Sequence, residues 1–356
     1  MDEQPKKKGR WKKALKIIGL IFLVLVLFIT GAISRILFYG ALRTSDTNDV
    51  QNGAIPQTPE DAEKSEIEDS LPMDPEDDED LPNTDDLQKP PDNPPPIEEN
   101  DDVVNILIVG QDSKNTNIRT RSDTMILISV HTEAKQVTLT SFMRDAYVKI
   151  PGYANNKLNS AYEKGGLKLL NETLKVNFGV EVDGNVIIDF NSFKDIVDML
   201  GGVDIELTAK EAEYLVNGGK HDVKVGMNRL NGKQALDYAR LREIDSDYQR
   251  TNRQRKVIMS IIQRYKQLPI TEMLSMVDQV LPMIVTDMDE VTIVGMVLEC
   301  GPVAATAAYG TQQIPANGTF DQGYVKVREG LKNWFQYNID FEENRRIIEQ
   351  IMNGKR

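Results

Sequence analysis

Apolar residues recur with strand-like spacing from residue 103 onward. The run V-V-N-I-L-I-V-G at 103–110 is typical of a buried strand. Residues 125–130 and 137–143 have the composition of two hairpin strands joined across a turn at 131–135. Further strands are predicted at 185–190, at 203–207, near 311–314 and near 324–327.

Segments with helical apolar spacing alternate with these strands. Asn159 is expected to cap a helix that runs to about Asn177, with an interruption at Gly165–Gly166. Asn191 is expected to cap a helix that ends at Gly201–Gly202. Other helices are predicted from Thr208, from near Asn231 to Arg240, and at about 251–267, 270–281, 289–299 and 340–352. The mixture predicts an α/β fold, a single α-β-α domain at 103–356 with a central mixed sheet.

The N-terminal residues have a different pattern. Residues 1–16 are basic, and residues 17–39 contain an apolar run close to the roughly 20 residues that a membrane-spanning helix needs. The positive charge before this run predicts a cytoplasmic N-terminus and an extracellular C-terminal domain. A cleaved signal peptide is the alternative, but no convincing small-residue cleavage site follows the run directly. We therefore predict an uncleaved signal anchor in the cell membrane.

Residues 44–102 are rich in Pro, Asp and Glu and nearly lack aromatic residues. Such a composition buries too little apolar surface to fold, so we expect a disordered linker that tethers the domain to the membrane. This segment accounts for the acidic balance behind the formal net charge of −13. The residues after it are nearly neutral, so the charge of the whole chain does not indicate a substrate.

Cysteine and histidine usage excludes several kinds of site. Cys300 is the only cysteine, so no intrachain disulfide can form. It lies in an apolar run and is expected to be a small core residue rather than a nucleophile. His131 and His221 fall in predicted turns. A Ser–His–Asp triad or a histidine-rich zinc site is therefore disfavoured.

A concentration of cations between Leu230 and Lys256 is the strongest chemical signal in the chain. If the helix ends near Arg240, the following extended backbone turns Arg240 and Arg242 to one face. In the next helix Arg250, Arg253 and Gln254 are three and four residues apart and share a face. Clustered guanidiniums near a helix N-terminus suit phosphate oxygens. The alternative is a solvated basic face with ion pairs to intervening acids.

Acidic residues and another arginine stand near the ends of the predicted strands. Asp112 follows the first strand, Asp123 precedes the second, and Arg144–Asp145 follow the third. Strand ends are where open α/β sheets present functional groups. Two carboxylates without histidine or cysteine suit Mg²⁺, which also takes water and phosphate oxygens. Taken singly, Asp112 could be a turn residue, and Asp123 could bond to its own backbone.

Several motifs identify a family resemblance. I-L-I-V-G-Q-D, R-S-D-T-M-I-L, M-R-D-A-Y-V, K-L-N-S-A-Y-E-K-G-G, G-G-V-D-I and L-N-G-K-Q-A-L-D-Y-A-R-L-R occur in this order. Together they resemble the LytR–CpsA–Psr family of cell-wall glycopolymer transferases. The resemblance implies Mg²⁺ (or Mn²⁺) held by Asp112 and Asp123, with Asp123, Arg144, Asp145 and Arg242 acting in catalysis. Pyrophosphate binding is assigned to Lys114, Arg121, Arg144, Arg240, Arg242, Arg250, Arg253 and Gln254.

The implied reaction transfers a glycopolymer from undecaprenyl pyrophosphate to a hydroxyl of peptidoglycan. One departure is Lys114, where the family usually has arginine, so a point charge replaces a bidentate fork. A hydrolase that uses water as acceptor would need the same residues. A non-catalytic phosphoglycan-binding regulator or scaffold is an alternative of another class. Nucleic-acid binding is disfavoured because the predicted domain is extracellular and lacks net positive charge.

Overall fold

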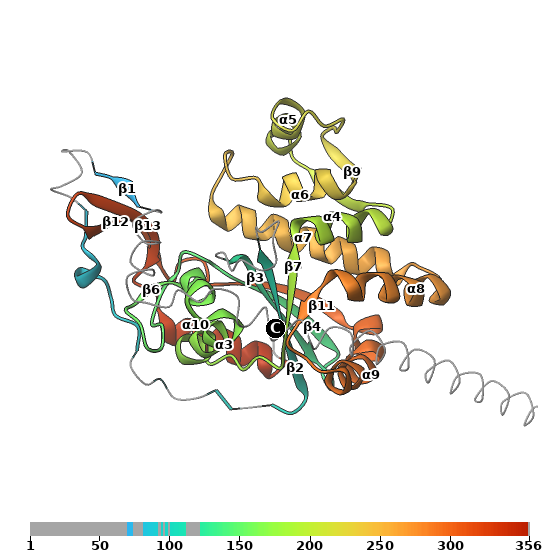
Figure 1. Cartoon of the computed structure of the whole chain (residues 1–356), viewed down its shortest axis with the longest axis horizontal. Helices are drawn as coiled ribbons and strands as arrows, with labels where there is room; N and C mark the ends of the chain where they lie inside the picture. The colour runs from blue at the N-terminus through green and yellow to red at the C-terminus, as the bar shows by residue number, and fades with distance from the viewer. Residues whose placement is uncertain are drawn as a thin grey trace, which may run out of the picture.

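The computed structural model describes residues 70–73, 81–91, 94, 97–98, 100–111 and 122–354. A six-stranded mixed sheet forms its centre (Figure 1). The strands are β2 (Val103–Gln111), β3 (Ser122–His131), β4 (Gln136–Phe142), β7 (Gly184–Asp189), β10 (Val285–Thr286) and β11 (Ala308–Ile314).

The strands of this sheet are arranged in the order β10-β7-β2-β3-β4-β11. Strand β3 is antiparallel to β2 and β4, whereas β7 is parallel to β2 and β11 is parallel to β4. The predicted mixed sheet and the β3–β4 hairpin are therefore confirmed. Because β2, β4, β7 and β11 all run in one direction, their C-terminal ends meet at one end of the sheet, which we call its carboxyl end.

Helices cover both faces of the sheet. They are α3 (Leu158–Phe178) and α10 (Phe341–Met352) on one face, and α7 (Asp247–Lys266) and α9 (Glu290–Thr306) on the other. Leu107 and Leu127 pack on the side of α3 and α10, whereas Ile126 and Leu139 pack on the side of α7 and α9. Successive strand residues thus point to opposite faces of the sheet. This arrangement confirms the α-β-α architecture. Cys300 is buried between the sheet and α9, which confirms the prediction of a core residue. Burial raises the pKa of its thiol to about 11.

A further group of elements lies beyond α7 and is called the helical part below (Figure 1). It contains α4 (Phe190–Met199), β8 (Val203–Leu207), α5 (Ala209–Asn217), β9 (Gly226–Leu230), α6 (Gly232–Arg240) and α8 (Ile270–Val280). Its core gathers around Leu215, Leu230 and Tyr238. Capping boxes at Thr208 and Asn231 begin α5 and α6, as predicted. Strand β9 was not predicted, because Leu230 is its only fully buried side chain.

Several predicted helix boundaries are wrong by a few residues. The cap of α4 is Asp189 and not Asn191, because the Asp189 side chain directly follows β7 and accepts the amide of Ser192. Helix α3 begins at Leu158, without a side-chain cap from Asn159. Helix α7 begins four residues earlier than expected, at Asp247. The interruption in α3 is confirmed at Gly166, whose φ of 64° is non-helical.

Part of the segment expected to be disordered instead packs on the domain, which therefore does not begin at residue 103. Strand β1 (Leu71–Pro72) pairs with β13 (Leu331–Tyr337), which also pairs with β12 (Asp321–Arg328). Leu87 is only 4% exposed and joins an apolar cluster on this hairpin. We call residues 81–91 the docked segment. Average composition concealed it, because one buried leucine provides its main apolar contact.

The predicted basic tail, the predicted anchor at 17–39 and most of the predicted linker lie outside the described residues. Among the helices that the structure does describe, none combines the length and apolar character needed to cross a bilayer.

Candidate active site

Asp123 lies at the carboxyl end of the sheet, in a β-bulge between β2 and β3. Gly110 pairs with Thr124 and Gln111 pairs with Ser122, so Asp123 is the extra residue. Bulges next to functional sites redirect a side chain out of the regular alternation. The close approach requires glycine at 110, because a Cβ there would lie 2.9 Å from Cβ of Thr124.

Arg144 lies two residues after the end of β4 and contacts Asp123 across the carboxyl end of the sheet. Its Nη1 is 2.5 Å from Oδ1 of Asp123, and its Nε is 3.2 Å from Oδ2 of Asp145. Burial alone would lower the pKa of Arg144, but the carboxylates of Asp145, Asp123 and Asp247 raise it above its usual value. The guanidinium is therefore held in place by charge-assisted hydrogen bonds and stays cationic.

Asp145 contacts Arg144, and both of its carboxylate oxygens are paired. Its Oδ1 is 3.2 Å from Nζ of Lys157, a buried residue of the short strand β6 (Asn156–Lys157). Burial favours the neutral acid, but Arg144 and Lys157 outweigh it and lower the pKa of Asp145 below its usual value. Because both of its oxygens are paired and only 8% of its side chain is exposed, Asp145 is placed to orient Arg144 rather than to meet an acceptor hydroxyl.

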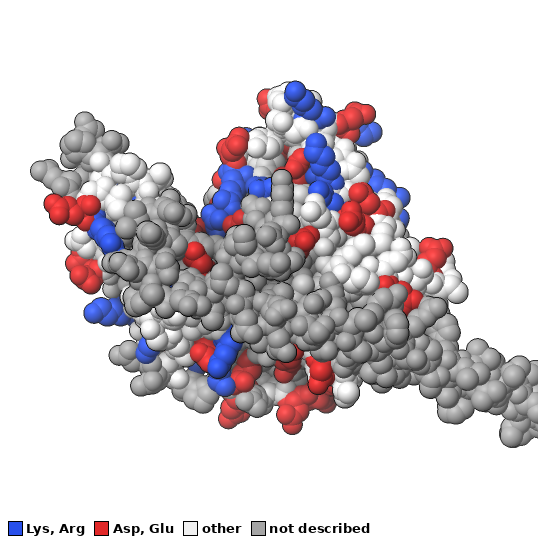
Figure 2. Space-filling view, in the orientation of Figure 1, with Lys and Arg blue, Asp and Glu red and all other residues white. Residues whose placement is uncertain are grey.

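Arg242 reaches the same carboxylate from the helical part. Helix α6 ends at Arg240, as predicted, and Nη2 of Arg242 lies 3.2 Å from Oδ1 of Asp123. The Arg242 side chain is 45% exposed, so much of it is available to a ligand. Arg240 has a different neighbour, because its guanidinium carbon is 4.4 Å from the ring centroid of Phe190. Figure 2 shows Lys and Arg side chains over the visible face of the helical part, mixed with acidic ones, with one group on its left flank.

Arg250, in the first turn of α7, is almost completely buried at 1% exposure. Its Nη2 is 2.7 Å from Oδ1 of Asp247, but Nε and Nη1 have no hydrogen-bond partner among the described residues. Burial lowers the pKa of Arg250 to about 10, with contributions in the same direction from Arg144 and Arg242. A buried, under-partnered cation beside two others is costly without an anion, so this arrangement favours an anionic ligand.

Arg253 is placed differently from the other arginines and has internal partners. Its Nη1 and Nη2 form a bidentate pair with Asp245 at 2.7 and 2.8 Å, and Nη2 also donates to the carbonyl of Leu241 at 2.6 Å. Glu211 lies 3.6 Å away, and only 2% of the Arg253 side chain is exposed. These contacts fasten the α6–α7 connection, which carries Arg242, to α7. In this arrangement Arg253 supports the connection, and its predicted phosphate contact stays a prediction.

The geometry brings Arg144, Arg242 and Arg250 around the single carboxylate of Asp123. Both Arg144 and Arg242 contact Oδ1 of Asp123, and Arg250 adds a buried positive charge. Burial alone would raise the pKa of Asp123, but these three arginines lower it. Four cations, with Lys157 included, face the three carboxylates of Asp123, Asp145 and Asp247. The excess positive charge and the guanidinium donors suit a ligand with several anionic oxygens, such as a phosphate or a diphosphate.

Comparison with known proteins decides the family. Residues 63–338 match the LytR_cpsA_psr family. This chain belongs to the LytR_cpsA_psr family. The resemblance found in the sequence motifs is thereby confirmed, and the match also includes the docked segment.

Named relatives of this LytR_cpsA_psr chain have two kinds of description. Regulatory protein MsrR of Staphylococcus aureus (strain Mu50) is 37% identical over 161 residues, which are 44% of this chain and 48% of MsrR. The polyisoprenyl-teichoic acid–peptidoglycan teichoic acid transferase TagT of Bacillus subtilis is 33% identical over 174 residues, 47% of this chain and 54% of TagT. The chain thus aligns with about half the length of these relatives.

Solved structures of the LytR_cpsA_psr family share the fold. The structure of TagT bound to LIIa-WTA has a TM-score of 0.59 at 24% identity and covers 72% of this chain and 94% of that one. TagT with bound octaprenyl pyrophosphate lipid has a TM-score of 0.54 at 23% identity, with the same coverage. At these identities the likeness establishes the fold alone.

Asp247 pairs with Arg250, one of the ion pairs with intervening acids that the alternative interpretation of the cation cluster predicted. Two other residues at this LytR_cpsA_psr site, Lys157 and Asn159, were not predicted to be there, and Lys157 pairs with Asp145. Asn159 donates its backbone amide to the carbonyl of Arg144, and its buried Oδ1 has no partner among the described residues. Asn159 belongs to the K-L-N-S-A-Y motif, so the motif was a usable signal. Lys157 is the first residue of the same motif, but its pairing with Asp145 depends on the fold.

Asp112, Lys114 and Arg121 lie outside the described residues, so their predicted roles stay predictions. Gln254 is half-buried on α7. Within the described part of the chain, no group of three or more His, Cys, Asp or Glu residues could hold a metal ion. Mg²⁺ needs only one or two carboxylates beside water and substrate oxygens. Asp123 fits such a ligand, because both arginine contacts go to Oδ1 and leave Oδ2 for other partners.

Proposed function

We propose that this protein transfers a glycopolymer from a polyprenyl (undecaprenyl) pyrophosphate carrier to a hydroxyl group of peptidoglycan and forms a phosphodiester. The observation that carries the proposal is the convergence of Arg144, Arg242 and the buried Arg250 on Asp123. Relatives named teichoic acid transferases and a TagT structure with a polyprenyl pyrophosphate support the donor class.

In the proposed reaction, the acceptor hydroxyl attacks the phosphorus on the glycan side of the pyrophosphate. The bond from this phosphorus to the bridging oxygen breaks, and polyprenyl phosphate leaves with the electron pair. Negative charge grows on the leaving phosphate, and preorganised cations stabilise it without reorganisation. We assign this role to Arg144, Arg242 and Arg250. Mg²⁺ (or Mn²⁺), held by Asp123 and Asp112, would supply further neutralisation of phosphate oxygens.

The supporting residues have separate roles. Asp145 and Lys157 fix the position of Arg144, since each oxygen of Asp145 has a cationic partner. Of the two acids considered as proton acceptors, Asp123 is the better candidate, because 28% of its side chain is exposed to an approaching hydroxyl. Arg253 holds the connection that carries Arg242.

The proposed location follows from the N-terminal sequence. An anchor at residues 17–39 with the domain outside the cell would keep the site close to a lipid-linked donor in the same membrane. The acidic segment would then limit how far the domain reaches from the bilayer. The proposal includes no nucleic-acid partner.

The test uses full-length protein, a defined polyprenyl-pyrophosphate saccharide and peptidoglycan, with and without divalent metal. We expect a phosphodiester-linked glycan on peptidoglycan, and its loss in Asp123→Ala and Arg144→Ala. Release of the saccharide phosphate to water, with none attached to peptidoglycan, would show a hydrolase instead. Donor binding without any turnover would favour a regulator, the description carried by MsrR.

A further inference from the structure

A cavity of about 320 Å³ is lined by residues of the docked segment and of the β12–β13 hairpin. Thr84 and Lys89 line it from the docked segment, Asn155 from the loop between β5 (Tyr147–Val148) and β6, and Asn333 from β13. No step of the transfer described above uses this cavity. Its volume is at the low end of the roughly 300–1,000 Å³ of small-molecule sites, which is room for a ligand about as large as one sugar ring.

A chain of polar contacts connects the cavity wall to Arg144. Asn333 accepts a hydrogen bond from Nζ of Lys157 at 2.8 Å, and Lys157 lies 3.2 Å from Asp145. Asp145 in turn orients Arg144, which contacts Asp123. Three buried or partly buried ionic side chains, those of Lys157, Asp145 and Arg144, therefore connect the cavity wall to the candidate active site.

The wall of the cavity differs in chemistry from the arginine cluster. Asn155, Asn156 and Asn333 line the cavity with amides, of which the Asn156 and Asn333 oxygens also accept hydrogen bonds from Lys157. Asp85 and Lys89 bring opposite charges from the docked segment, and Arg328 of β12 adds a further cation. Hydroxyl and acetamide groups match such a lining, because they both donate and accept hydrogen bonds. A polymer with many phosphates would instead prefer the arginines.

The position of the cavity favours the acceptor over the donor. An in-line displacement requires the nucleophile and the leaving group on opposite sides of the phosphorus. Of the three arginines assigned to the leaving phosphate, Arg242 comes from the helical part and Arg250 from α7. Arg144 lies between them and the side chains that lead to the cavity. The cavity belongs to β6 and the β12–β13 hairpin, which lie on the other side of the carboxyl end of the sheet (Figure 1).

We infer that this cavity is a subsite for a sugar ring of the peptidoglycan glycan strand, which directs a nearby acceptor hydroxyl toward the pyrophosphate. The inference rests on the proposed function for the identity of the acceptor. The docked segment thus forms one wall of a substrate site in addition to covering an apolar surface.

The test blocks the cavity without removing a hydrogen bond. Ala154 is exposed and lines the cavity, so Ala154→Trp fills it. Ala209→Trp is the matched control, an exposed alanine at the start of α5 in the helical part. Asn155→Ala is a second variant that removes one amide of the wall. Calorimetry with a soluble N-acetylglucosamine tetramer and transfer kinetics on peptidoglycan are measured with full-length protein.

In Ala154→Trp we expect the Kd for the tetramer and the KM for peptidoglycan to rise about tenfold or more, a clear loss of binding. Asn155→Ala shifts both in the same direction, and Ala209→Trp matches the wild type. Unchanged values in Ala154→Trp overturn the inference, and a raised KM for the lipid donor alone overturns the assignment to the acceptor. If the wild-type protein does not turn over the donor either, the proposed function fails. The calorimetry then still decides whether the cavity binds a saccharide.

Discussion

Asp123 Oδ1 lies 2.5 Å from Nη1 of Arg144, although 21 residues separate them along the chain. The bulge turns Asp123 out of β3, and Arg144 follows the end of β4, so adjacent strand ends bring the two together. Arg242 contacts the same oxygen from the helical part. One carboxylate thus links the sheet to the α6–α7 connection and fixes two guanidiniums for a ligand.

Arg242 and Arg253 differ in what their loss should affect. Arg253→Ala breaks a buried bidentate pair with Asp245, and we expect a loss of about 3–5 kcal/mol in the free energy of unfolding. Arg242→Ala removes a partly exposed contact and should cost at most about 1 kcal/mol. Its transfer rate should fall by about 100- to 1,000-fold, since a donor to the transition state is lost. Urea denaturation and transfer kinetics on both variants make the comparison. An inactive, strongly destabilised Arg242→Ala would contradict the assignment.

The pH dependence of stability should respond to Arg144. The folded pKa values of Asp123 and Asp145 are lowered, because Arg144 and the neighbouring cations outweigh burial. Their stabilisation is present above the unfolded pKa of about 4 and is lost as pH falls through the folded values. In Arg144→Met the raising effect of burial is less opposed, so both folded pKa values rise toward the unfolded value and less stabilisation is left to lose as pH falls.

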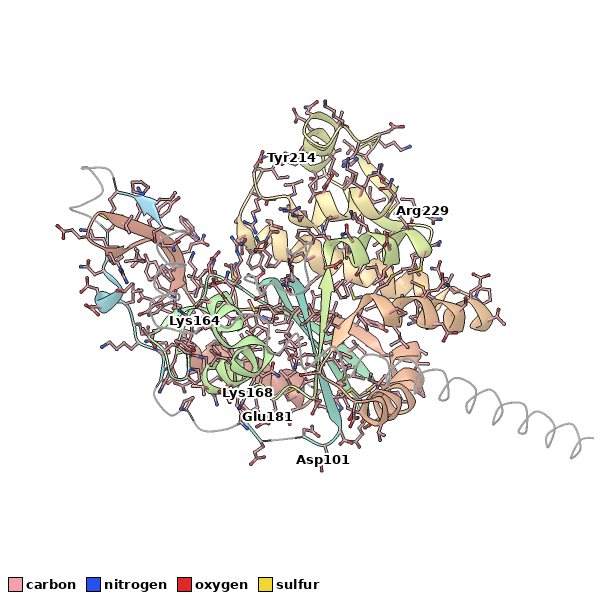
Figure 3. All side chains as sticks on the ribbon, viewed as in Figure 1. Asp101, Lys164, Lys168, Glu181, Tyr214 and Arg229 are labelled. Carbon is pink, nitrogen blue, oxygen red and sulfur yellow. The ribbon has the colours of Figure 1, made fainter. Side chains whose placement is uncertain are left out.

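The measurement for this prediction is the free energy of unfolding in urea at pH 7 and at pH 3. The loss of stability between the two pH values should be smaller in Arg144→Met than in the wild type. Arg229→Met is the control, because Arg229 pairs with the exposed Asp204 on the outer side of the helical part (Figure 3). Equal pH dependence in Arg144→Met and Arg229→Met would show that Arg144 does not set these pKa values.

The docked segment should detach when its apolar contact is lost. Leu87→Asp places a charge in the cluster formed with Tyr147, Val325 and Phe335, and burying an unpaired carboxylate there is unfavourable. We expect a brief protease treatment to cut within residues 81–91 several times faster, while the rest of the domain stays intact. Lys89→Asp, which changes an exposed side chain, is the control. Equal cleavage of wild type and Leu87→Asp would show that the leucine does not hold the segment.

Much of the fold could be predicted because each central strand is a continuous apolar run and each helix has its own apolar face. The arginines and Asp123 were recognisable from residue type and motif order. The internal pairing of Arg253 was not recognisable, because spacing along a helix does not show which residue of another segment will pair with a side chain. That residue is Asp245. The bulge at Asp123 arises because Gly110 pairs with Thr124 and Gln111 with Ser122. No local pattern in the sequence shows this pairing. The docked segment was missed because a single leucine is invisible in an average composition.

The central claim is that the arginines around Asp123 bind a diphosphate. Calorimetric titration of the full-length protein with octaprenyl pyrophosphate, octaprenyl phosphate and octaprenol tests it directly. The account predicts that affinity falls in this order, and that Arg250→Met lowers affinity for the pyrophosphate far more than for the alcohol. Equal affinity for all three lipids, or pyrophosphate binding that is unchanged in Arg144→Met, Arg242→Ala and Arg250→Met, would contradict it.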